Sequence, residues 1–187
     1  NINLKKQTDG SSPYCIMSIF AALATKATSP KVELVNTDIE INGAASSSAG
    51  RISNPFAYLF SKIGAKFYSV SLNQCNIHGT ARVDWSLFEQ MESVSISNSQ
   101  ISIGGCDYHG YYINAPKRLQ ITGTTFTGRL GKYNTLVSVP NVKDYSHSID
   151  NTTVDASVSK LFTTSPDRRH TRITNVRTRT TNRPITK

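Results

Sequence analysis

Acidic side chains are scarce in this sequence. Its 187 residues include 12 Asp and Glu against 21 Lys and Arg, and charged residues make up 18% of the chain. Hydrolysis of a glycosidic bond usually needs two carboxyl groups held about 5 to 10 Å apart. The candidates are Glu89 with Glu92, Asp84 (beside Trp85) with Asp107, and Asp38 and Glu40 with Asn76, the last two sets if neighbouring coils bring them together. No pattern chooses among them, so catalytic residues stay unassigned.

Cysteine is also rare, and no two cysteines are spaced as C-x-x-C. An odd number of scattered cysteines indicates neither a disulfide framework nor a zinc site. The histidines are too far apart in sequence to predict a metal cluster. We therefore expect no metal and no cofactor. The residues concerned are Cys15, Cys75, Cys106, His78, His109, His147 and His170.

Long apolar runs are missing too. No stretch of 18 apolar residues exists, so we expect no transmembrane helix and no membrane partner. Hydrophobic residues still make up 37% of the chain, which is enough for one core in a single domain.

What the sequence does contain is a repeated phrase between residues 32 and 178. Two apolar residues stand five positions apart, and Ser, Thr, Asn or Gln alternate with apolar residues around them. Successive phrases begin 36, 26, 25, 28 and 24 residues apart, as expected when one supersecondary unit repeats with loops of variable length. Strict alternation and many β-branched residues favour strands over helices.

These features predict an all-β fold, a right-handed parallel β-helix of about six coils, with a β-sandwich or jelly roll as the alternative. Further apolar clusters at 86–91, 111–113 and 135–139 would supply the other walls of each coil. One internal column should contain Leu34, Val70, Ile96, Ile121, Ile149 and Ile173. A second should contain Ile39, Cys75, Ile101, Phe126, Val154 and Thr178.

The phrase at 35–43, which reads VNTDIEING, resembles the coils of pectate-lyase-like β-helices. The low fraction of charged residues and the abundance of Ser, Thr and Asn resemble the composition of bacteriophage tailspike and tail-appendage proteins. The resemblance rests on periodicity and on no invariant motif. It implies a homotrimer that contacts other virion tail proteins and a bacterial surface polysaccharide, which some members cleave. The expected location is the virion or the extracellular space.

The two ends differ from the body of the chain. Residues 1–31 are expected to cap the first coil, residues 32–166 to form the β-helix, and residues 167–187 to form a basic segment. Seven of the 21 basic residues lie in the last 20, which contain no acid. This segment is either a last coil that contacts a subunit, a site for a polyanion, or an ordinary solvated end. Its arginines are Arg168, Arg169, Arg172, Arg177, Arg179 and Arg183. Nucleic acid is not favoured, because no aromatic residues accompany them.

The best candidate for sugar binding is an aromatic and polar cluster at a coil corner. Aromatic faces pack on the apolar C–H patches of sugars, and charged or amide groups pair with their hydroxyls or acids. The candidates are Asp107, Tyr108, His109, Tyr111, Tyr112, Lys117 and Arg118, with Trp85. A tyrosine here could instead fill the interior of the coil.

Two classes of function follow. The first is a structural and receptor-binding component of a virion tail appendage, a tailspike or tail fibre. The alternative is a polysaccharide lyase or glycoside hydrolase on the same scaffold. We favour the first, because few titratable groups cluster at any one place and a fold alone does not imply chemistry.

Overall fold

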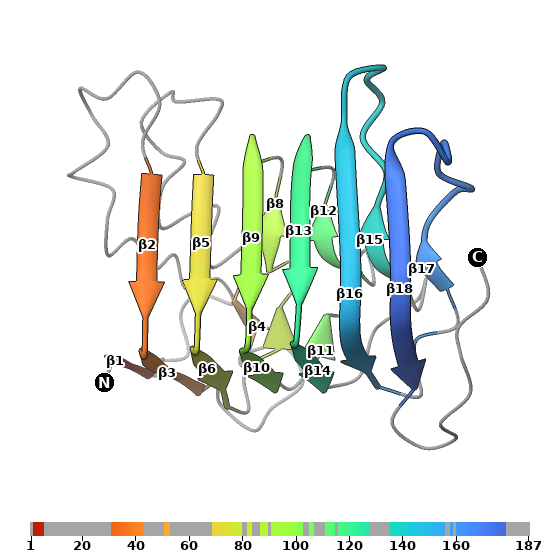
Figure 1. Ribbon diagram of the computed structural model, residues 1–187. Helices are drawn as coiled ribbons and strands as arrows, with labels where there is room; N and C mark the ends of the chain where they lie inside the picture. The colour runs from red at the N-terminus through yellow and green to blue at the C-terminus, as the bar shows by residue number, and fades with distance from the viewer. Residues whose placement is uncertain are drawn as a thin grey trace.

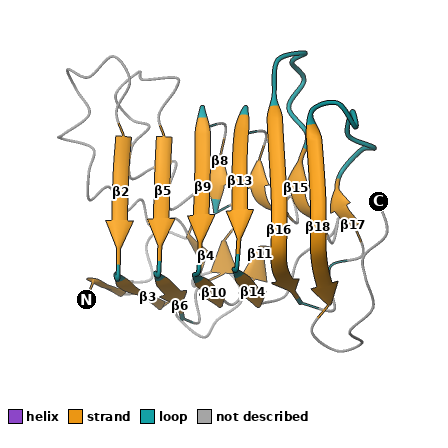
Figure 2. Ribbon diagram, viewed as in Figure 1, coloured by secondary structure: helices purple, strands orange, loops and turns teal. Residues whose placement is uncertain are grey.

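The computed structural model describes residues 2–5, 31–42, 51–52, 69–79, 82–83, 87–89, 91–102, 105–106, 111–114, 116–127, 135–155, 158 and 160–178. In this part of the chain every regular element is a strand, and every strand pair is parallel (Figures 1 and 2). The strands stack as a β-solenoid, consistent with a right-handed β-helix, as the repeated phrase predicts.

Four walls make up the solenoid. Wall A is the row of long strands in Figure 1: β2 (Lys31–Val35), β5 (Ser69–Asn73), β9 (Ser93–Ser97), β13 (Arg118–Thr122) and the first halves of β16 (Ser146–Val154) and β18 (Thr171–Thr178). Wall B contains β1 (Ile2–Lys5), β3 (Asp38–Asn42), β6 (Asn76–His78), β10 (Gln100–Ser102), β14 (Thr125–Thr127) and the second halves of β16 and β18.

The two remaining walls are shorter. Wall C contains β4 (Arg51–Ile52), β7 (Arg82–Val83) and β11 (Gly105–Cys106). Wall D contains β8 (Phe88–Glu89), β12 (Tyr111–Asn114), β15 (Thr135–Ser138) and β17 (Lys160–Phe162). The apolar clusters expected to supply further walls do so, because β8, β12 and β15 lie within them. Their buried column is Phe88, Ile113, Val137 and Phe162.

A tight corner joins wall A to wall B at every level. One residue there has a positive φ, between 44° and 57°, and these residues are Asn36, Gln74, Asn98, Gly123, Asn151 and Asn175. Glycine and asparagine tolerate this left-handed conformation better than most residues. At four levels the next residue donates its hydroxyl to the carbonyl two positions earlier, as in the bond from Ser99 Oγ to Ser97 O at 2.7 Å. Thr37, Thr124 and Thr152 make the same bond.

The predicted columns are confirmed at five levels and wrong at one. The column on wall A is Leu34, Leu72, Ile96, Ile121, Ile149 and Ile173, and the column on wall B is Ile39, Ile77, Ile101, Phe126, Val154 and Thr178. Val70 and Cys75 therefore do not belong to them. A two-residue shift preserves the alternation, so apolar spacing alone cannot detect it.

Cys75 instead occupies the corner position at which four other levels carry Ser or Thr and the last carries Val176. Its Sγ lies 3.4 Å from Asn73 O and 3.2 Å from Leu34 O, and it is a buried free thiol. Had Val70 been the column residue, Leu72 would occupy the positive-φ position, which a bulky side chain disfavours. The corner geometry thus explains why this level is displaced.

The ends of the chain continue the stack as far as the structure describes them. Strand β1 pairs with β3, so residues 2–5 extend wall B beyond its first coil; residues 6–30 lie outside the described part. Strand β18 pairs with β16 along seven residue pairs. Residues 171–178 therefore form a further level of the solenoid, and Arg179 and Arg183 lie outside the described residues.

Candidate functional site

The outward side of wall A carries columns of small polar side chains. Because strand register is exact, like residues stand beside one another at a spacing of about 4.8 Å. We call this surface the hydroxyl face, and its central column is Glu33, Ser71, Ser95, Gln120, Ser148 and Arg172. The flanking columns are Lys31, Ser69, Ser93, Arg118 and Ser146, and Val35, Asn73, Ser97, Thr122, Asp150 and Thr174.

The hydroxyl face is well suited to hydrogen bonding along an extended ligand. Each hydroxyl provides one donor and two acceptor lone pairs, and the alternating burial pattern keeps these serines half-buried rather than freely mobile. Some side chains are already ordered by neighbours, as in the bond from Ser97 Oγ to Asn73 Oδ1 at 2.9 Å. The central column carries its only charges at the two ends, Glu33 and Arg172.

The structure removes Tyr112 from the predicted sugar-binding cluster. Its side chain has no exposed surface, and its hydroxyl donates a hydrogen bond to Thr127 O at 2.8 Å. The ring packs against Phe126 with centroids 5.5 Å apart, so Tyr112 fills the coil interior and cannot stack on a sugar. This corrects the prediction in favour of its alternative, that a tyrosine of this cluster fills the interior of the coil.

The remaining aromatic candidates are not placed. Tyr111 begins β12, but its side chain lies outside the described part, as do Trp85, Asp107, Tyr108 and His109.

Lys117 and Arg118 are placed, and both contact a carboxylate that was not predicted with them. Glu92 Oε1 lies 2.6 Å from Arg118 Nη1, and Glu92 Oε2 lies 3.0 Å from Lys117 Nζ. Their charges are partly offset at this corner, although the Arg118 side chain is 62% exposed and keeps donors available to solvent.

A second polar group forms on the outward side of wall B. Asn76 Nδ2 donates to Asp38 Oδ1 at 2.7 Å, and His78 Nε2 lies 3.1 Å from the same oxygen. The Asn76 hydrogen bond and then the His78 contact lower the pKa of Asp38, while the carboxylate stays exposed. Asp38 and Asn76 do converge from neighbouring coils, as one reading of the sequence allowed.

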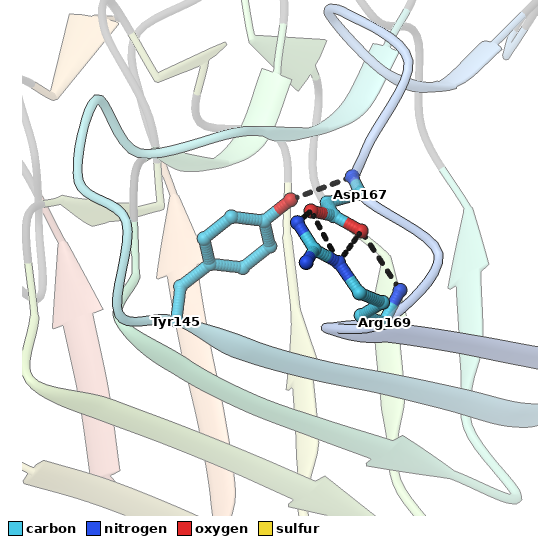
Figure 3. Close-up of polar contacts among 3 residues, drawn as sticks. All are labelled: Tyr145, Asp167 and Arg169. Atoms are coloured by element: carbon cyan, nitrogen blue, oxygen red, sulfur yellow. Dashed lines mark hydrogen bonds and ion pairs between the residues drawn. The ribbon is translucent and has the colours of Figure 1, made fainter.

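The third group lies at the loop between β17 and β18. Figure 3 shows the Arg169 side chain folded back onto the carboxylate of Asp167, with Arg169 Nη2 at 2.7 Å from Oδ2 and Nε at 3.2 Å from both oxygens. The backbone N–H of Arg169 also donates to Asp167 Oδ1 at 2.9 Å. These bonds lower the pKa of Asp167 to about 2.

Tyr145 fixes this loop to the wall behind it. Its hydroxyl oxygen accepts a hydrogen bond from the backbone N–H of Asp167 at 2.8 Å (Figure 3). The Tyr145 ring also contacts the rings of His147 and His170, at centroid distances of 4.9 and 5.3 Å. The same loop and strand β18 line a small surface pocket, whose residues are Ser165, Pro166, Arg168, Thr171 and Ile173.

His147 is the one titratable side chain in the interior column of wall A. The column reads Val32, Val70, Val94, Leu119, His147 and Thr171. His147 Nε2 bonds Pro116 O at 2.8 Å, and burial lowers the pKa of the imidazole. Nδ1 of His147 and Oγ1 of Thr171 are buried with no hydrogen-bond partner among the described residues.

Among the described residues, no cluster of three or more His, Cys, Asp or Glu could hold a metal ion. No helix in the described ranges is long and apolar enough to cross a membrane. Comparisons with protein-family models, curated proteins and solved structures found no match.

Sequence reasoning missed the hydroxyl face, the pairing of Glu92 with Lys117 and Arg118, and the Asp167 loop. A signal for the first was present, because serines recur at positions 69, 71, 93, 95 and 97 between apolar residues. The other two features could not be found in this way, because they depend on which residues become neighbours when the chain folds. Arg168, Arg169, Arg172 and Arg177 are all exposed, as expected for a basic end.

Proposed function

We propose that this protein is a structural and receptor-binding element that contacts bacterial surface polysaccharide. The proposal takes its biological setting, a virion tail appendage built as a homotrimer, from the resemblance of the coils to tailspike proteins. The observation that supports polysaccharide contact is the hydroxyl face, a flat and regular array of half-buried serines on rigid strands.

A rigid array favours binding because its side chains lose little freedom when a ligand arrives. Ordering one flexible side chain costs about 0.5 to 1.5 kcal/mol on binding, and serines held on a sheet largely avoid this cost. A sugar chain is extended and carries hydroxyls at regular intervals, so it can bond to several levels at once. Parallel stacking also gives a long, stiff support, as an attachment organelle requires.

The hydroxyl face is tested by adding bulk at its centre. Ser95 stands between Ser71 and Gln120 in the central column, and Ser95→Gln enlarges the side chain without changing charge. The matched control is Ser102→Gln, at an exposed serine of the same coil on wall B. Binding to immobilised lipopolysaccharide or capsule is then measured by interferometry. We expect Ser95→Gln to weaken binding about tenfold, which is about 1.4 kcal/mol, and Ser102→Gln to leave it unchanged.

Two results would overturn the proposal. One is equal binding by wild type and Ser95→Gln. The other is release of new reducing ends or of unsaturated, ultraviolet-absorbing fragments from the polysaccharide, which would establish the lyase or hydrolase alternative. Light scattering tests the assembly separately: a trimeric mass is expected at micromolar concentration, and a monomer would contradict it.

A further inference from the structure

The pocket beside the β17–β18 loop combines a cavity with unmatched positive charge. Its volume is about 110 Å³, and it is lined by Ser165, Pro166, Arg168, Thr171 and Ile173. A cavity of about 150 Å³ holds a benzene molecule, and a water takes up about 30 Å³ in the liquid. The pocket therefore has room for one small charged group and part of the ring that carries it, but not for a polymer.

Arg168 supplies the charge. The only acid in the loop is Asp167, and its carboxylate is already engaged by the side chain and backbone of Arg169. No carboxylate pairs with Arg168 among the described residues, and its side chain is exposed at the rim. A guanidinium group with free donors is well matched to a carboxylate or sulfate, which it can bind through two parallel hydrogen bonds.

The rest of the lining is mixed in a way that suits a sugar. Pro166 and Ile173 provide apolar surface for C–H groups, and Ser165 provides an exposed hydroxyl. Thr171 also lines the pocket, and its Oγ1 has no hydrogen-bond partner in the part of the chain that the structure describes. The bond from Asp167 N to the Tyr145 hydroxyl and the Asp167–Arg169 pair connect the loop that carries Ser165, Pro166 and Arg168 to its surroundings.

We infer that this pocket binds the carboxylate of an acidic sugar residue, a uronic acid at the end or on a branch of the polysaccharide. The inference rests on the proposed function and deepens it by naming an acidic rather than a neutral glycan. The hydroxyl face then contacts the polysaccharide along its length, and the pocket binds one charged sugar residue of it.

The test is a titration of the 15N-labelled protein followed by amide chemical shifts. The probes are glucuronate, glucose and inorganic sulfate at equal concentrations and constant ionic strength. We expect glucuronate to shift amides within 163–173 in a saturable way and glucose to leave them unchanged. Arg168→Gln should remove the response. Arg177→Gln, which removes an exposed arginine from β18 away from the pocket, should preserve it.

The outcomes separate this inference from the proposed function. Equal responses to glucuronate and glucose, or a glucuronate response that survives Arg168→Gln, would overturn it. Sulfate shifting the same amides as strongly as glucuronate would show a general oxyanion site and would contradict a sugar-specific one. If Arg168→Gln does not alter binding of the intact polysaccharide, the pocket is refuted and the hydroxyl face stands. If glucuronate shifts the amides but the polysaccharide does not bind, the proposed function is refuted and the pocket stands.

Discussion

Gly123→Ala tests the corner that joins walls A and B. Gly123 has a φ of +57°, in the same column as the positive-φ residues Asn98 and Asn151. A Cβ built on Gly123 would lie 2.6 Å from Asn98 Oδ1, the end of a side chain in the preceding coil. The substitution therefore imposes a left-handed conformation on alanine and forces the Asn98 amide to move.

The expected cost follows from three contributions. Holding an L-residue in the left-handed region costs about 1 to 2 kcal/mol. Displacing the Asn98 amide adds a smaller penalty, because the clashing atom ends a flexible side chain. Alanine also reduces the freedom of the unfolded chain, which offsets about 0.4 to 1 kcal/mol. We expect a net loss of about 1 to 2 kcal/mol, which lowers Tm by about 2 to 8 °C in a domain of this size.

Urea unfolding gives the measurement, and a double-mutant cycle isolates the contact between coils. Asn98→Ala removes the clashing oxygen, so the double variant should be less destabilised than the sum of the single variants by about 0.5 kcal/mol or more. The control is Ser102→Ala on an exposed strand position, which should change stability by less than about 0.5 kcal/mol. If Gly123→Ala is neutral or stabilising, or if the two effects simply add, the stacked corner is wrong.

Three further predictions concern the core and two titrating groups. Ile101→Asp should cost about 4 kcal/mol or more in urea unfolding, because it places a carboxylate in a fully buried column; an unchanged midpoint would place Ile101 outside the core. Burial lowers the pKa of His147, so the unfolded state takes up its proton more readily and stability should fall as pH drops below about 6.5. His147→Leu should reduce this dependence between pH 7 and 5, and an unaltered pH profile would contradict the argument. The Asp167 carboxyl should titrate near 2 by NMR, and its contribution to stability, fully present above its usual pKa of 3.8, should decline below 3.8 and be lost as pH falls through about 2. Arg169→Gln should raise the midpoint toward 3.8, and a wild-type midpoint already there would refute the ion pair.

Much of the fold could be predicted from the local sequence, because each coil of a solenoid repeats the same short pattern of apolar and polar residues. Alternation identified the strands, and the five-residue spacing identified the two columns on either side of a corner. The single error, Val70 and Cys75 in place of Leu72 and Ile77, arose because a two-residue shift leaves the apolar pattern intact. The corner gives an argument against Val70, because Leu72 would then occupy the positive-φ position, where other levels carry Asn36, Asn98, Gly123, Asn151 and Asn175. It does not by itself select Leu72, because the corner residue at this level is Gln74.

The candidate sites were harder to predict because they depend on neighbours about 25 residues apart. Arg118 was chosen for its charge, but its partner Glu92 becomes adjacent only when the coils stack. Tyr112 was chosen for its ring, but the ring packs on Phe126 of wall B, a contact that exists only once the coils have closed. A single serine carries little signal, and the serines become a surface only when the strands β5, β9, β13 and β16 lie side by side.

Distances along one outward column test the central claim most directly. With the three cysteines replaced by serine, nitroxide labels are placed in pairs at Ser71 with Gln120, Ser148 or Arg172, and the separations are measured by electron–electron double resonance. In-register stacking predicts Cβ separations of about 10, 14 and 19 Å, increasing by about 4.8 Å per level. Distances that do not increase in this order, or a broad distribution beyond about 30 Å for Ser71 with Arg172, would contradict the solenoid.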